Sequence, residues 1–210
     1  MSETSRTVHL VDDDEAIRRS ASYMLRTSGY VVKTYASGLE LLDQPRPLAT
    51  GCILLDIRMA GMDGLEVQAA LREQNVLLPV IIITGHGDVD LAVRAMKGGA
   101  VDFIEKPFEK IVLVDAIEKA FERLDRSDKR HARAEEAQAR LAVLTGRERD
   151  VLQGLVQGYP NKTIAYDLGI SPRTVEIHRA NLMSKLGVAS LSEALRIAFK
   201  AGLGEEDEDA

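Results

Sequence analysis

The chain has 210 residues, a length that fits one large domain or two small ones. Its 45% hydrophobic content is enough for a sizeable core, but no stretch approaches the ~20 apolar residues of a membrane span, and residues 1–9 lack the apolar run of a secretory signal. The single cysteine, Cys52, excludes an internal disulfide and suits a reducing compartment, so we expect a cytoplasmic protein without a membrane partner.

The net charge of −6 is unevenly distributed along the chain. Residues 1–123 carry 14 Lys and Arg against 19 Asp and Glu, whereas residues 145–203 carry 8 against 5. The last seven residues, "GEEDEDA", carry five acids and no base. An acidic first half and a mildly basic second half indicate two domains with different partners. The basic excess is too small to predict nucleic-acid binding without a motif.

The first 123 residues alternate between short apolar runs and helical patterns. "CILLD" and "VIIIT" are continuous apolar runs, which is typical of strands buried on both faces. Five such strand–helix units predict an α/β fold with a parallel sheet, helices on both faces and right-handed crossovers. The predicted strands are Thr7–Val11, Tyr30–Tyr35, Gly51–Leu55, Pro79–Ile83 and Val101–Glu105, and the predicted helices are Asp14–Thr27, Gly38–Asp43, Gly64–Glu73, Val89–Lys97 and Glu109–Leu124.

The second half of the chain shows helical patterns and no strand. Residues 124–140 are charged, rich in alanine and free of Pro and Gly, which predicts a solvated helix or a semi-rigid linker. Four helices follow, the first opened by a capping box at Thr145 and Glu148 and the third by Ser171 and Pro172. The predicted divisions are therefore a domain at 1–123, a helical linker at 124–140, an all-α domain at 141–203 and an acidic tail at 204–210, whose role the sequence leaves open.

Polar side chains follow four of the five predicted strands. In an open parallel sheet, chemistry collects beyond the carboxyl ends of the strands. Each of these residues alone has an ordinary explanation, such as helix capping or a surface charge, but their joint pattern predicts one site. The residues are Asp12 and Asp13 after the first strand, Asp56 after the third, Thr84 after the fourth and Lys106 after the fifth.

Clustered carboxylates raise one another's pKa unless a cation neutralises them. Hard oxygen ligands with room for water suit Mg²⁺. A metal ion beside Asp56 would allow that carboxylate to attack a phosphorus atom. Lys106 would pair with the phosphoryl oxygens, and the hydroxyl of Thr84 would donate to one of them. The sequence thus predicts a carboxylate that becomes a phosphoanhydride.

Residues 1–123 resemble the receiver domain of two-component response regulators. The motifs "LVDDDE", "LLDIRMAGMDG", "IIITGHGD" and "GAVDFIEKPF" occur in that family's order and spacing. The resemblance implies a flavodoxin-like, doubly wound sheet of order 2-1-3-4-5. It also implies that the chain is not an enzyme beyond its own Mg²⁺-dependent phosphorylation and dephosphorylation.

The same resemblance assigns roles to individual residues. It makes Asp56 the phosphoacceptor, and it makes Mg²⁺ or Mn²⁺ the cofactor. Ala60 stands where many relatives have proline, a departure that we expect to loosen the loop without removing a ligand. The implied metal ligands are Asp12, Asp13, Asp56 and the main-chain carbonyl of Arg58; the implied switch and phosphoryl-binding residues are Thr84, Phe103 and Lys106; and the implied cis peptide bond joins Lys106 and Pro107.

The second half, from Leu144 to Val188, resembles the LuxR/NarL-type helix-turn-helix. With the receiver attached, nearly the whole chain is similar to the FixJ-type response regulators. This resemblance implies a sensor histidine kinase and double-stranded DNA as partners, a homodimer when phosphorylated, and RNA polymerase as a further candidate partner. The expected function is transcriptional control by phosphorylation-gated, sequence-specific DNA binding.

The third helix of this domain has two distinct faces. Val175, Leu182 and Leu186 share one face, which must pack on the other helices. The opposite face has almost no large apolar group and is suited to a major groove. We predict that Arg173 reads guanine, that Glu176 accepts a hydrogen bond from cytosine, and that Ile177 or Ala180 contacts a thymine methyl group. Thr174 and Asn181 flank this face. The residues better placed for phosphates are Lys162, Arg179 and Lys185, of which Arg179 projects nearer the packing edge.

Two other functions compete with this interpretation. A phosphohydrolase of the haloacid-dehalogenase type also uses a strand-end aspartate, Mg²⁺ and a lysine, but it needs a second aspartate two residues after the nucleophile, where this chain has Arg58. A receiver that binds protein and never takes phosphate is the other alternative, and the complete residue set argues against it.

Overall fold

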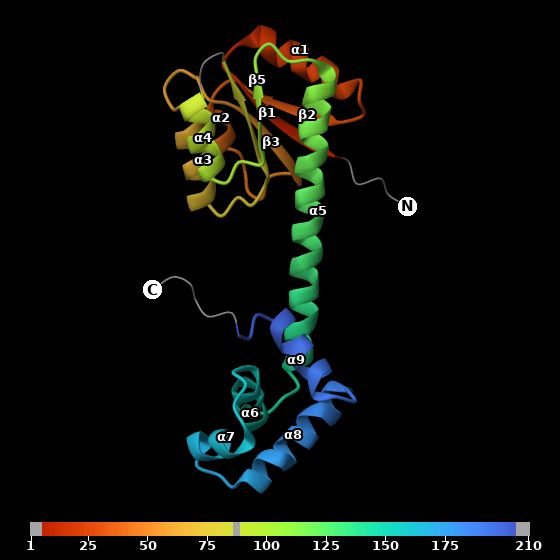
Figure 1. The fold of residues 1–210 in the computed structure, drawn as a ribbon. Helices are drawn as coiled ribbons and strands as arrows, with labels where there is room; N and C mark the ends of the chain where they lie inside the picture. The colour runs from red at the N-terminus through yellow and green to blue at the C-terminus, as the bar shows by residue number, and fades with distance from the viewer. Residues whose placement is uncertain (1–5, 86–88, 205–210) are drawn as a thin grey trace. The chain divides into compact units, whose positions relative to one another are not determined.

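The computed structural model describes residues 6–85 and 89–204 (Figure 1). The chain divides into two compact units, one ending at Arg126 and one beginning at Ser127. Among the described residues, no helix is both long enough and apolar enough to cross a membrane.

The first unit is built on a five-stranded parallel sheet. Its strand order is β2-β1-β3-β4-β5, which confirms the predicted fold class and order. The order reverses between β1 and β3, so the carboxyl ends of these two strands lie side by side at the point where open parallel sheets bind ligands. The strands are β1 Thr7–Val11, β2 Val31–Tyr35, β3 Gly51–Asp56, β4 Val80–Thr84 and β5 Asp102–Glu105.

Two strands end one residue later than the sequence pattern predicts. Asp56 still pairs with Ile83, and the main-chain N–H of Ile57 donates to the carbonyl of Ile83. Hydrogen bonding between strands therefore continues past the last apolar residue. As a result, Asp56 and Thr84 are the final residues of β3 and β4 and are held by the sheet.

Helices cover both faces of the sheet (Figure 1). Side chains alternate between the two faces because a strand has a period of two. Cys52 and Leu54 of β3 pack with α1 and the first part of α5, whereas Ile53 and Leu55 pack with α2, α3 and α4. The helices are α1 Glu15–Arg26, α2 Gly38–Leu42, α3 Gly64–Glu73 and α4 Val89–Lys97.

Helix α5 differs from its predicted length. It extends from Lys110 to Leu141 as one helix and includes the predicted linker. The sequence of residues 124–140 predicted either a solvated helix or a semi-rigid linker, and in the structure these residues are helical. Its first part contributes Leu113 and Ile117 to the core of the first unit, and its last turns contribute Ala137 and Leu141 to the core of the second.

The described part of the second unit, up to residue 204, contains four further helices. The capping box of Thr145 and Glu148 opens α6, and Ser171 caps α8 with Pro172 in its first position, as the sequence predicts. Glycines in the left-handed conformation end α7 and α8, which suits a residue without a Cβ atom. The bounds are α6 Gly146–Val156, α7 Asn161–Leu168, α8 Pro172–Leu186 and α9 Leu191–Lys200.

His9 is a fully buried polar residue of β1. Its Nε2 lies 2.9 Å from the carbonyl oxygen of Ala49, and its Nδ1 lies 3.0 Å from the hydroxyl of Tyr35. A carbonyl only accepts, so Nε2 carries the hydrogen and Nδ1 accepts from the hydroxyl of Tyr35. Burial is the main cause that lowers the pKa of His9, and the hydrogen bond to Ala49 only partly opposes it.

We expect His9 to make the first unit less stable in mild acid. The unfolded state takes up a proton near pH 6.5, whereas folded His9 resists it, so stability falls as the pH drops below about 6.5. Between the two pKa values, each pH unit changes the free energy of unfolding by about 1.4 kcal/mol. Urea unfolding between pH 7.5 and 5.5 measures this slope. His9→Leu should be less stable throughout and should lose the slope; an unchanged slope would assign the acid sensitivity to other groups.

Candidate functional site

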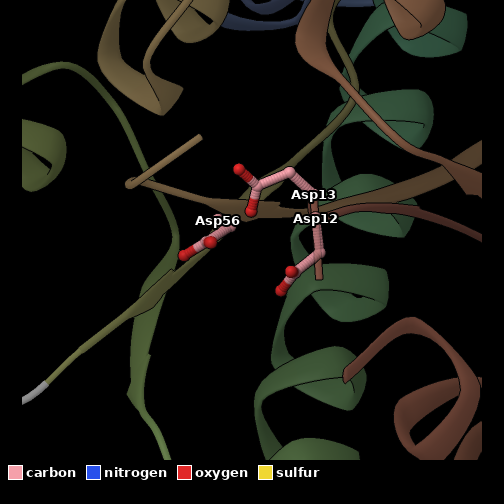
Figure 2. A group of neighbouring side chains, drawn as sticks. All are labelled: Asp12, Asp13 and Asp56. Atoms are coloured by element: carbon pink, nitrogen blue, oxygen red, sulfur yellow. The ribbon is translucent and has the colours of Figure 1, made fainter. Parts of the chain in front are cut away.

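Three carboxylates converge at the carboxyl ends of β1 and β3 (Figure 2). Asp12 and Asp13 directly follow β1, and Asp56 ends β3. One oxygen atom from each carboxylate lies within 4.8 Å of the others. Asp12 and Asp56 are buried and Asp13 is exposed. The strand order brings these residues together because β1 and β3 are adjacent at the reversal point.

Lys106 places its ammonium group between two of these carboxylates. Its Nζ lies 2.8 Å from Oδ2 of Asp12 and 2.9 Å from Oδ2 of Asp56. Burial raises the pKa of Asp56, because the contact with Lys106 offsets desolvation only in part. Burial lowers the pKa of Lys106, but its hydrogen bonds to Asp12 and Asp56 outweigh this and leave the pKa above its usual value. Lys106 thus carries the positive charge that partly compensates the cluster.

The three consecutive aspartates each have a different contact. Asp14 caps α1 and accepts from the main-chain N–H of Ala16. Oδ1 of Asp12 accepts a hydrogen bond of 2.9 Å from the N–H of Asp14, and Oδ2 of Asp13 accepts one of 3.0 Å from the N–H of Ala60. The adjacent like charges are therefore separated into one helix cap and two carboxylates that cluster with Asp56.

The donor set fits a divalent cation with a preference for oxygen. Oδ2 of Asp12 is fully buried and lies 2.8 Å from the ammonium group of Lys106. A buried carboxylate oxygen in this position is suited to binding positive charge. Carboxylate ligands with one open, exposed side match the needs of Mg²⁺, which retains several waters.

The remaining predicted receiver residues surround this cluster. Thr84 is buried at the end of β4, and its hydroxyl donates to the carbonyl of Gly85 at 3.3 Å. Phe103 lies on β5 with its side chain about half exposed. Arg58 is in the segment between β3 and α3, and the peptide bond between Lys106 and Pro107 is cis.

Helix α8 presents the two faces that its sequence indicates. Val175, Leu182 and Leu186 are buried in the core of the second unit, as predicted. Thr174 and Arg179 are half-buried, and Lys162 is exposed on α7. The other residues of α8 that we assigned to DNA are exposed, namely Arg173, Glu176, Ile177, Ala180, Asn181 and Lys185.

Two basic residues that we assigned to phosphate contacts have partners within the unit. Nζ of Lys185 lies 2.7 Å from Oε2 of Glu148, a buried residue of the α6 capping box. The hydrogen bond from Lys185 is the main cause that lowers the pKa of Glu148. Nη1 of Arg179 donates to Oδ1 of Asn161 at 2.8 Å. Lys185 and Arg179 therefore join helices to one another, which sequence spacing alone did not indicate.

Sequence reasoning also missed two contacts beside the carboxylates. Nη1 of Arg18 donates to the main-chain carbonyl of Asp12 at 2.6 Å, and the N–H of Ala60 donates to Asp13. The departure at Ala60 was a signal in the sequence, but the sequence did not show what its N–H would contact. The acidic tail at 205–209 lies outside the described residues.

Comparison with known families matches both halves of the chain. Residues 8–118 match the response regulator receiver domain. Residues 142–198 match the bacterial regulatory proteins of the luxR family.

Relatives and solved structures match almost the whole chain. Transcriptional regulatory protein FixJ of Rhizobium meliloti is 48% identical over 96% of this chain and 98% of its own, and FixJ of Azorhizobium caulinodans is 47% identical over 97% of each. The structure of response regulator StyR matches with a TM-score of 0.70 and 41% identity over 93% of this chain and 99% of its own. Full-length FixJ from B. japonicum matches with a TM-score of 0.60 and 44% identity over 94% and 97%. The chain therefore belongs to the FixJ-type response regulators, transcriptional regulators with a receiver domain followed by a LuxR-type DNA-binding domain.

Proposed function

We propose that Asp56 accepts a phosphoryl group from a sensor histidine kinase, and that Mg²⁺ or Mn²⁺ is required. The observation that carries this proposal is the arrangement of Lys106 between Asp12 and Asp56, beside the exposed carboxylate of Asp13. Asp12, Asp13 and Asp56 would hold the ion with the main-chain carbonyl of Arg58. Bound Mg²⁺ supplies positive charge that offsets repulsion between a carboxylate and a phosphoryl group.

Asp56, Lys106 and Thr84 have different roles in the proposed phosphoryl transfer. An oxygen of Asp56 attacks the phosphorus of the kinase's phosphohistidine, so a P–O bond forms and the P–N bond breaks. The electron pair goes to the ring nitrogen, which takes a proton from water. Lys106 turns its ammonium from the carboxylates to the phosphoryl oxygens. The hydroxyl of Thr84 donates to one of these oxygens in place of Gly85. Because position 58 is Arg58, no aspartate stands two residues after Asp56 to act as a general acid, and the phosphoryl group persists.

Labelling by acetyl phosphate tests this proposal. Incubation of the full chain with acetyl phosphate and Mg²⁺ should add one phosphoryl group, detected by intact mass, and chelation of the metal should prevent it. A chain that remains unmodified would instead be a receiver that only binds protein. If labelling occurs, we propose that the chain catalyses only its own phosphorylation and dephosphorylation. We also propose that the protein is cytoplasmic.

Phosphorylation is expected to promote a two-fold dimer through α4, β5 and α5. The first unit exposes apolar side chains there, which favours burial against a partner. They are Val93 and Met96 of α4, Phe103 of β5, and Ile111 and Val112 of α5. We propose that Thr84 moves toward the phosphoryl group and that Phe103 follows, which changes this face.

Analytical ultracentrifugation at micromolar protein should show a dimer only after phosphorylation. Ile111→Arg should keep the phosphorylated chain monomeric, because it places a charge in the apolar face. Tyr23→Arg on α1 is the matched control, since Tyr23 is 72% exposed and Ile111 74%. Equal monomer fractions with and without phosphate would contradict the proposal.

DNA contacts are assigned to the exposed face of α8. We propose that the major groove is contacted by Arg173, Thr174, Glu176, Ile177, Ala180 and Asn181, and that phosphates are contacted by Lys162, Arg179 and Lys185. RNA polymerase is a further candidate partner.

Arg173→Ala should weaken specific binding by about 1–3 kcal/mol and leave the melting temperature of the second unit unchanged. Lys185→Ala should instead lower that melting temperature, because it removes the cation that compensates the buried carboxylate of Glu148 and leaves the N–H of Thr145 as its partner. Fluorescence anisotropy measures the loss of DNA affinity, and thermal melts measure the loss of stability. Equal melting temperatures for Lys185→Ala and the native chain would show that Lys185 does not stabilise the unit and serves only DNA binding.

A further inference from the structure

The segment between β3 and α3 contacts the carboxylate cluster through its backbone. The main-chain N–H of Ala60 donates to Oδ2 of Asp13 at 3.0 Å. Ala60 is exposed, and the buried side chain of Met59 anchors the segment beside it. This hydrogen bond joins the loop after β1 to the loop after β3.

The hydrogen bond fixes the one carboxylate of the three that is exposed. Asp12 and Asp56 are buried and share the contact with Lys106, whereas Asp13 has no salt bridge within the described residues. Without the N–H of Ala60, the side chain of Asp13 would sample several rotamers, and a metal ion would have to order it on binding. The hydrogen bond orders the carboxylate before any ion arrives.

A metal ion and the N–H of Ala60 need not compete for Asp13. An ionised carboxylate has two oxygens and about four lone-pair sites. Oδ2 accepts from Ala60, which leaves the lone pairs of Oδ1 for a metal ion as far as the described residues are concerned. The donated hydrogen bond then persists when a metal ion binds, so its stabilisation of the ordered carboxylate favours the bound state.

The segment that carries this N–H also contains Arg58, whose carbonyl we assign to the metal. Arg58 lies two residues before Ala60 in the segment that the hydrogen bond holds against Asp13. One of the four ligands that we assign to the metal, Asp13, therefore accepts from a main-chain N–H. A side-chain substitution that retains this N–H should preserve the contact, but proline, which has none, must remove it.

We propose that the main-chain N–H of Ala60 is a positioning group that increases the affinity of the site for Mg²⁺ by holding the carboxylate of Asp13. This inference rests on the proposed metal site at Asp12, Asp13 and Asp56. It distinguishes this chain from relatives with proline at this position, in which the hydrogen bond is unavailable.

Titration of the full chain with Mg²⁺, followed by amide chemical shifts, measures the effect without any phosphodonor. Ala60→Pro should raise the Kd for Mg²⁺ about threefold to tenfold, the range that corresponds to one hydrogen bond. Ala60→Ser, which retains the N–H, should restore a native Kd. In a double-mutant cycle, Ala60→Pro should add no further loss to Asp13→Ala, because the acceptor is already absent.

Three other outcomes of the Mg²⁺ titration would contradict either the proposed cofactor or this inference. If the native chain binds no Mg²⁺, the proposed cofactor is wrong. If the native chain binds Mg²⁺ and Ala60→Pro binds it equally well or more tightly, the N–H of Ala60 does not assist the metal and this inference is overturned. If Ala60→Pro still weakens binding in the Asp13→Ala background, proline acts by distorting the loop and the inference is overturned as well.

Discussion

Replacement of Asp56 by asparagine is expected to abolish Mg²⁺-dependent labelling by acetyl phosphate. The amide has nearly the shape of the carboxylate, but it is a poor nucleophile. Burial raises the pKa of Asp56, so the ionised carboxylate is costly in the folded chain. We therefore expect Asp56→Asn to melt at a temperature no lower than that of the native chain. Intact-mass measurement after acetyl phosphate treatment, together with thermal melts, tests both expectations.

Asp13→Asn is the comparison for this experiment. Asp13 lies in the same cluster but is assigned only to the metal, so its loss should slow labelling and raise the Mg²⁺ concentration needed without abolishing the reaction. Undiminished labelling of Asp56→Asn would place the acceptor elsewhere. Peptide mapping would then show whether Asp12 or Asp13 carries the phosphate.

Gly64→Ala is expected to disturb both the fold and the site. Gly64 is the first residue of α3, and its N–H donates to the carbonyl of Ile57 at 2.8 Å. A Cβ atom at this position would clash with the main-chain carbonyl oxygen of Asp56 and would lie 2.8 Å from Cα of Ile57. Backbone atoms cannot move aside as a flexible side chain can, so we expect a loss of about 1–3 kcal/mol in unfolding free energy, as for overpacked cores. Urea unfolding measures the loss, and slower acetyl phosphate labelling should accompany it because Asp56 shifts.

Gly146→Ala is a matched control. Gly146 is also the first residue of a helix and also follows a capping-box residue, Thr145. A Cβ atom there meets nothing within 4 Å. Alanine has the better helix propensity, so Gly146→Ala should be neutral or slightly stabilising. Comparable losses at both positions would show that the close approach of α3 to β3 is not the cause.

Some features of the site were predictable because they depend on nearby residues. The apolar runs of the five strands indicated the doubly wound sheet, since buried parallel strands need apolar side chains on both faces. Thr145 and Ser171 were identified as helix caps because a cap bonds to the backbone two or three residues further on. The order of the strands and the roles of Phe103 and Arg58 came only from the family resemblance.

The amino-acid sequence by itself determined the α/β and all-α halves, the packing face of α8 and the gathering of Asp12, Asp13 and Asp56 at strand ends. Only the tertiary structure decided what the side chains contact across long separations. It paired Lys185 with Glu148, Arg179 with Asn161, and the N–H of Ala60 with Asp13. The physical reason is that periodicity and capping act over a few residues, whereas these contacts join elements 18 to 47 positions apart and depend on how helices and loops pack. Lys185 of α8, which the sequence indicated as a phosphate contact, forms an ion pair with Glu148 of α6 in the folded unit.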